Sequence, residues 1–169
     1  MSRLFLLRHG RAAWAEPGER DFDRPLTDDG RRESLRVGAM MLANGYRPDR
    51  VVCSPARRAL ETWHGVARAL DMRASEAMLC QTLYSDDAAA YLTVVRSNGA
   101  GGSLLIIGHN PTLEDLAIGL SAPGLGPARA DLDKGFPTAG LAVLSFEGGL
   151  SEAMLGTATL EAFVIPSEH

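Results

Sequence analysis

The pattern of apolar and polar positions predicts short buried strands that alternate with amphipathic helices. Each predicted strand is a short apolar run, and the runs cover 3–7, 51–53, 104–107, 141–146 and 157–164. Helical spacing of apolar residues fills most of the intervening segments, at about 27–44, 54–70, 87–97 and 110–120. This alternation predicts one domain over residues 1–169: an α/β fold built as a three-layer α/β/α sandwich with a mostly parallel central sheet.

Local signals set the expected ends of these helices. Thr27 is expected to cap the first helix, whose apolar face is predicted to contain Leu35 and Leu42. Ser54 is expected to cap the second helix, with Pro55 in its first turn. The segment 121–140 is rich in glycine and proline and is predicted to be a loop, whereas the two last strands are expected to pair at a sheet edge.

Composition narrows the class of protein. With 46% hydrophobic and 22% charged residues, the 169-residue chain has the composition of an ordinary globular protein. A net charge of −4 argues against nucleic acid as a partner. No apolar run approaches the ~20 residues of a membrane span, and Cys53 and Cys80 are expected to be reduced, so we expect a cytoplasmic protein with no membrane partner.

Candidate chemistry gathers where three predicted strands end. The first strand is followed by Arg8-His9-Gly10, the second by Ser54-Pro55-Ala56-Arg57-Arg58, and the third by Gly108-His109-Asn110-Pro111. Ligands of parallel sheets bind at the carboxyl ends of the strands, and helix N-termini attract anions. Only Lys134 among the seventeen cationic side chains is a lysine, and arginine is the residue that grips phosphate bidentately. The sequence therefore predicts a phosphate site.

Helical spacing decides which of two adjacent arginines enters this site. Arg57 shares a stripe with Glu61 and is predicted to lie on the solvated face. Arg58 shares its stripe with small residues that allow close helix packing, namely Thr62, Gly65 and Ala69. We therefore expect Arg58 to face the site.

The same residues resemble the motifs of the histidine phosphatase superfamily, which has the phosphoglycerate-mutase-like fold. The Arg-His-Gly signature corresponds to 8–10, the second motif to Ser54-Pro55-x-x-Arg58-Ala59-x-x-Thr62, and the third to Gly108-His109-Asn110-Pro111. Arg24-Pro25-Leu26-Thr27-x-x-Gly30 is similar to a fourth element of the family. The short length and the Arg-Pro-Leu-Thr variant resemble the compact SixA-like branch, which lacks a lid insertion and whose type member acts on phosphohistidine of a signalling protein.

The resemblance implies a mechanism and a set of site residues. His9 is the implied nucleophile, forming a phosphohistidine that water hydrolyses. Arg8, Arg58 and His109 would hold the phosphoryl oxygens, and neither a cofactor nor a metal is expected. Arg24 is a further candidate for substrate binding. Asn110 is expected first to cap a helix and only secondarily to contact phosphate.

The acid that protonates the leaving group in this family has no clear counterpart. The corresponding region is Leu83-Tyr84-Ser85-Asp86-Asp87, where Asp86 or Asp87 could serve as the general acid, with Asp86 the candidate, although helix capping is the favoured role of either residue. Without an acid, an imidazole leaving group is favoured over an alkoxide, because histidine titrates near pKa 6.5. We therefore expect a phosphorylated protein, with phosphohistidine favoured. A phosphatase of small phosphorylated metabolites or of phosphoserine and phosphothreonine is the alternative enzyme, and a catalytically silent phosphoprotein-binding module is the alternative of another class.

Overall fold

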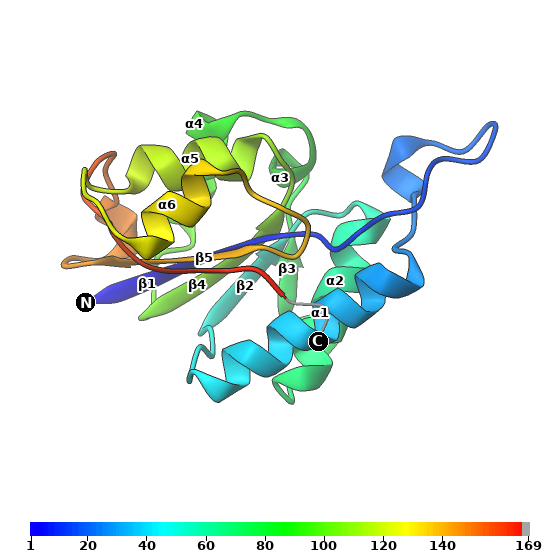
Figure 1. The fold of residues 1–169 in the computed structure, drawn as a ribbon, viewed down its shortest axis with the longest axis horizontal. Helices are drawn as coiled ribbons and strands as arrows, with labels where there is room; N and C mark the ends of the chain where they lie inside the picture. The colour runs from blue at the N-terminus through cyan, green and yellow to red at the C-terminus, as the bar shows by residue number, and fades with distance from the viewer. Residues whose placement is uncertain (167–169) are drawn as a thin grey trace.

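The computed structural model describes residues 1–166 as a twisted sheet with helices on both faces (Figure 1). In the described residues the sheet has six strands, in the order β3-β2-β4-β1-β5-β6. Their bounds are β1 Ser2–Arg8, β2 Arg50–Cys53, β3 Ala77–Leu79, β4 Ser103–Gly108, β5 Leu141–Phe146 and β6 Thr159–Val164. The four strands from β3 to β1 are parallel, and β5 and β6 are antiparallel additions at one edge. The predicted mostly parallel sheet with a late antiparallel pair is confirmed.

The helices form the two outer layers, as the lower and upper halves of Figure 1 show. On one face, α1 (Asp28–Ala43) and α2 (Arg57–Ala69) pack with the sheet around Trp63 and Met41. On the other face lie α4 (Ala88–Ser97), α5 (Thr112–Leu120) and α6 (Pro127–Asp133). A short helix, α3 (Thr82–Ser85), joins β3 to α4. The α/β/α sandwich predicted from the sequence is confirmed.

The inward face of α1 differs from the prediction. Leu35 and Leu42 are exposed, whereas Ser34, Gly38 and Met41 are buried. The reason is the close approach of α2: a Cβ on Gly38 would lie 2.7 Å from the Cβ of Ala69 on α2. Small residues thus form the helix–helix contact, and Leu35 and Leu42, at neighbouring angles, remain exposed to solvent.

Two further corrections concern short elements. The segment 121–140, predicted to be a loop, contains α6, which begins with Pro127 at its first position and buries Leu132. The short helix α3 and the edge strand β3 were not predicted either. β3 is only three residues long and leaves Met78 and Leu79 exposed, so it carries no clear alternation of apolar and polar positions. Among residues 1–166, no helix is both long and apolar enough to cross a membrane.

Candidate active site

Three strand ends meet at one edge of the sheet and bring two histidines together. Arg8 of β1 lies opposite Gly108 of β4, and β2 ends beside β4 on the other side. His9 follows Arg8 and His109 follows Gly108. Both histidines are buried, and their ring centroids are 5.2 Å apart. The convergence expected at the carboxyl ends of the strands is therefore present in the structure.

The residues of the motifs hold the turn after β1 in place. The backbone N–H of Gly10 donates to Thr62 Oγ1 of α2 at 2.9 Å. A Cβ on Gly10 would lie 2.7 Å from the carbonyl oxygen of Gly30 in α1, so only glycine fits between the two backbones. Thr62 and Gly30 thus fix the position of His9 from both helices of the lower layer.

His9 has a defined tautomer. Its Nδ1 lies 2.7 Å from the carbonyl oxygen of Gly10, an atom that can only accept a hydrogen bond, so Nδ1 carries the proton. Burial lowers the pKa of His9 to about 4, against the opposing effect of that carbonyl and with help from the charge of Arg58. At neutral pH the ring is therefore uncharged, and its Nε2 lone pair is available as a nucleophile.

The second histidine is oriented by Ser54. His109 Nε2 lies 2.8 Å from Ser54 Oγ, which also accepts a hydrogen bond from the N–H of Ala56. Because the fully buried hydroxyl has no other acceptor among the described contacts, it donates to Nε2 and the ring proton of His109 is on Nδ1. Burial lowers the pKa of His109 to about 3, with the nearby His9 as the next cause.

This contact corrects the predicted role of Ser54. The helix α2 begins at Arg57, its N-cap is Ala56, and no side chain caps it. In the described part of the chain, the one backbone N–H that donates to the Ser54 hydroxyl is that of Ala56, two residues ahead, which makes a turn before the helix rather than a cap. Its hydroxyl instead belongs to the histidine site, a role that the sequence analysis missed.

Two arginines lie beside the imidazoles. Arg8 Nη1 donates to the carbonyl oxygen of Phe136 at 2.8 Å. Arg58 is 6% exposed, whereas Arg57 lies outside, paired with Glu61 at 3.1 Å. The structure thus separates the two adjacent arginines as the helical spacing predicts.

Three buried donors of this cluster have no hydrogen-bond partner among the described residues. They are Arg8 Nε, Arg58 Nε and His109 Nδ1. Buried polar groups are nearly always paired, so an unpaired one calls for a partner such as a ligand, an ion or a water molecule. Three unpartnered N–H donors on residues that neighbour His9 suit an anion with several acceptor oxygens, such as a phosphoryl group.

Asp21 and Tyr84 complete the rim and were missed by the sequence analysis. Arg58 Nη1 donates to the Asp21 backbone oxygen at 2.8 Å, and Nη2 to Asp21 Oδ2 at 3.0 Å. The Tyr84 hydroxyl donates to the same Oδ2 at 2.9 Å, and its ring meets that of His109 edge-on. These contacts join segments 37 and 63 residues apart, so no local pattern announces them.

The remaining candidates are placed around the cluster in different ways. Arg24 is near enough to lower the pKa of His9 slightly, but its Nε is paired with Asp21 Oδ1 at 2.9 Å. The side-chain oxygen of Asn110 accepts a hydrogen bond from the N–H of Glu114 in the first turn of α5. Its amide nitrogen donates to the carbonyl oxygen of Phe136, which also accepts a hydrogen bond from Arg8. Asp86 follows the end of α3, and no described contact joins its carboxylate to the cluster. The adjacent Asp87 caps α4 through the N–H of Ala90.

The depressed pKa values predict how the site titrates. NMR of the imidazole signals should show His9 and His109 uncharged down to about pH 5, with midpoints near 4 and 3. Unfolded histidine titrates near 6.5, so the unfolded state binds more protons below that pH and folding stability should fall as the pH drops from 6.5 towards 4. A midpoint near 6.5 for either ring in the free protein would contradict this picture of the site.

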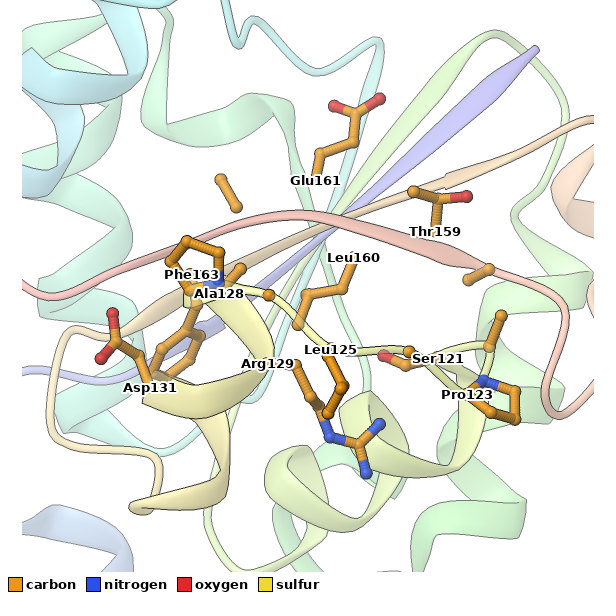
Figure 2. Close-up of a pocket in the computed structure, with 16 residues that line it drawn as sticks. Ser121, Pro123, Leu125, Ala128, Arg129, Asp131, Thr159, Leu160, Glu161 and Phe163 are labelled. Atoms are coloured by element: carbon orange, nitrogen blue, oxygen red, sulfur yellow. The ribbon is translucent and has the colours of Figure 1, made fainter.

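Other features of the surface lie apart from this cluster. A cavity of about 540 Å³ is bounded by 121–131 and by β6, with Leu125, Arg129 and Phe163 in its lining, and none of the cluster residues line it (Figure 2). Within residues 1–166, no group of three or more His, Cys, Asp or Glu side chains is arranged to hold a metal ion.

Curated proteins with similar sequences extend over most of the chain. An uncharacterised protein of Mycobacterium tuberculosis is 36% identical over 165 residues, which is 95% of this chain and 99% of the relative. Phosphohistidine phosphatase SixA of Escherichia coli is 31% identical over 128 residues, covering 74% of this chain and 77% of SixA.

Solved structures and a family model agree with these relatives. A SixA structure from Agrobacterium tumefaciens has a TM-score of 0.80 at 33% identity, over 98% of both chains. The protein histidine phosphatase SixA in complex with tungstate has a TM-score of 0.78 at 26% identity, over 97% of both chains. The family model of the histidine phosphatase superfamily (branch 1) matches residues 4–78. The chain therefore belongs to the histidine phosphatase superfamily, in its SixA-like branch, and is a hydrolase that acts on phosphate.

Proposed function

We propose that this protein removes the phosphoryl group from phosphohistidine on a protein, through a phosphohistidine intermediate on its own His9 and without a metal ion. The observation that carries the proposal is the state of His9, which is uncharged and presents Nε2 beside three unpartnered buried donors. A neutral imidazole of this kind is a nucleophile at physiological pH. The similarity to phosphohistidine phosphatase SixA supports the choice of substrate.

In the first step, the Nε2 lone pair of His9 attacks phosphorus and the bond from phosphorus to the leaving atom breaks. The electron pair of that bond stays with the leaving group, and Arg8, Arg58 and His109 Nδ1–H hold the phosphoryl oxygens. In the second step, water attacks phosphorus, the bond to Nε2 breaks, and inorganic phosphate leaves with both protons of the water. His9 is thereby returned to its starting state with the proton still on Nδ1.

Departure of the leaving group is the step at which the site favours phosphohistidine over phosphate esters. Asp21 is the carboxylate in hydrogen-bond contact with the described cluster, and its pKa lies at about 2. Burial acts to raise that pKa, but the hydrogen bond from Tyr84 and the charge of Arg58 outweigh it. At neutral pH Asp21 therefore has no proton to give an alkoxide. A phosphohistidine leaving group needs none, because its other ring nitrogen is already protonated near neutrality.

Access to the site suits a phosphorylated side chain that projects from a protein. The rim residues Asp21 and Tyr84 are exposed or partly exposed. The connection from α2 to α3 contains only η2 (Ala74–Glu76) and the short strand β3, without a covering insertion. We therefore expect a phosphorylated side chain to enter with its backbone outside, as a protein substrate requires.

A pair of peptides tests this proposal. One carries phosphohistidine and the other phosphoserine at the same position of the same sequence, and release of inorganic phosphate is measured with and without EDTA. We expect kcat/KM to be at least about 100-fold higher for the phosphohistidine peptide, the range in which acid catalysis contributes, and unchanged by EDTA. Equal rates on both peptides would favour a phosphoserine or metabolite phosphatase, and no turnover of either would favour a binding module.

A further inference from the structure

The carboxylate of Asp21 is unusual because it lies at the rim of the histidine–arginine cluster, which is proposed to bind an anion. It accepts hydrogen bonds from the buried Arg58, from Tyr84 and from Arg24, at 2.9 to 3.0 Å. Its side chain is nevertheless 55% exposed, whereas that of Arg58 is 7% exposed. A permanent negative charge therefore faces the solvent side of the arginine that is expected to hold the phosphoryl group.

The other arginine has carboxylates near it as well. Glu33 and Glu114 act on Arg8 and partly oppose the lowering of its pKa, whose first cause is burial. The hydroxyl of Thr138 donates to Glu33 at 3.0 Å, and Glu114 lies in the first turn of α5, where its N–H donates to Asn110. Both carboxylates thus act electrostatically on Arg8.

The charges of the site are therefore nearly balanced. The two histidines are neutral at pH 7, so the positive charge comes from Arg8, Arg24 and Arg58. The opposing carboxylates are those of Asp21, Glu33 and Glu114. One phosphoryl group can be bound through the unpartnered donors, but a second anionic group of the same small molecule that lies near Asp21 would meet its exposed carboxylate.

We propose that Asp21 is a specificity-determining residue, which admits substrates whose phosphoryl group is the sole anionic group at the site and rejects small phosphorylated acids. The inference rests on the proposed function and narrows its substrate class to phosphoryl groups with neutral or cationic surroundings, as on a protein side chain. Like charges placed together are a common means of rejecting the wrong ligand. Asp21 acts here through its charge, in addition to holding Arg58.

The test uses two inhibitors that differ in one charge. Glycerol 3-phosphate and 3-phosphoglycerate have the same three-carbon skeleton, but the second carries a carboxylate where the first carries a hydroxymethyl group. Their inhibition constants are measured against p-nitrophenyl phosphate for the wild type, for Asp21→Asn and for Asp23→Asn. Asp23 lies on the same short helix η1 (Asp21–Asp23) but pairs with Arg20, so its variant is a matched control.

We expect the wild type to bind 3-phosphoglycerate more weakly than glycerol 3-phosphate. In Asp21→Asn, the inhibition constant of 3-phosphoglycerate should fall by about tenfold relative to that of glycerol 3-phosphate. A change of this size is typical of removing one nearby like charge. Asp23→Asn should leave the ratio of the two constants within about twofold. An unchanged ratio in Asp21→Asn, or an equal loss for both inhibitors and for inorganic phosphate, would overturn the proposal, because Asp21 would then only hold Arg58.

Two further measurements keep the inference separate from the proposed function. If the protein does not hydrolyse p-nitrophenyl phosphate, calorimetric affinities for the same two compounds still decide the role of Asp21. Raising the salt concentration shortens the Debye length and screens exposed charges. The wild-type ratio of the inhibition constant of 3-phosphoglycerate to that of glycerol 3-phosphate should therefore fall towards one between about 0.05 and 0.5 M salt. A ratio that does not respond to salt would count against a role of charge, even where a variant fails to fold.

Discussion

Replacing His9 with alanine is expected to lower kcat for p-nitrophenyl phosphate by about 10⁴-fold or more, as removal of a covalent nucleophile does in other enzymes. The reason is that Nε2 of His9 is the atom proposed to form the bond to phosphorus, and Nδ1 is already committed to Gly10. Steady-state kinetics of the purified variant check the prediction.

Circular dichroism and the affinity for inorganic phosphate check that this variant is folded. Arg8, Arg58 and His109 remain, so phosphate should still bind, which separates a lost nucleophile from a lost site. Activity of His9→Ala within about tenfold of the wild type would contradict the proposed mechanism.

Replacing Arg58 with alanine is expected to lower kcat/KM by about 100- to 1,000-fold, the loss that follows removal of one preorganised donor to a transition state. Arg58 is buried, carries an unpartnered Nε and is held by Asp21 through both terminal nitrogens. Lysine should restore little of the activity, because it cannot reproduce the planar fork of donors.

The neighbouring Arg57 provides a matched control for this prediction. It is an arginine on the same helix turn, but it is exposed and paired with Glu61. Arg57→Ala should keep kcat/KM within about twofold, since a surface ion pair contributes little. Equal losses in the two variants would contradict the inward placement of Arg58 as the basis of activity.

Several parts of the fold and site could be predicted because their signals are local in sequence. Apolar runs in the sequence predicted β1, β2, β4 and β5. In a parallel sheet the carboxyl ends of the strands lie at one edge, which is where ligands bind. That rule placed His9 and His109 at the same edge, and the pairing of β1 with β4 brings them side by side. The stripe of small residues after Arg58 likewise predicted a close helix contact, which Gly65 makes with Ser34.

Other parts could not be predicted because they depend on contacts between distant segments. The buried face of α1 contains Ser34 and Gly38, and a pattern that weights large apolar residues selects Leu35 and Leu42 instead. The partnership of Asp21 with Arg58 has no sequence signal either, since it depends on where the segment before α1 passes the beginning of α2. The chemical roles of the site residues stay predictions, for which kinetics is the test.

The most direct test of the account is to trap the phosphoryl group on the protein. The enzyme is mixed with phosphorylated substrate, quenched in base within milliseconds, and mapped by mass spectrometry of its peptides. We predict an acid-labile, base-stable phosphoryl group on His9 Nε2, absent from His9→Ala and lost as inorganic phosphate appears. A productive enzyme that carries no phosphoryl group at His9, or carries it on another residue, would contradict the central claim.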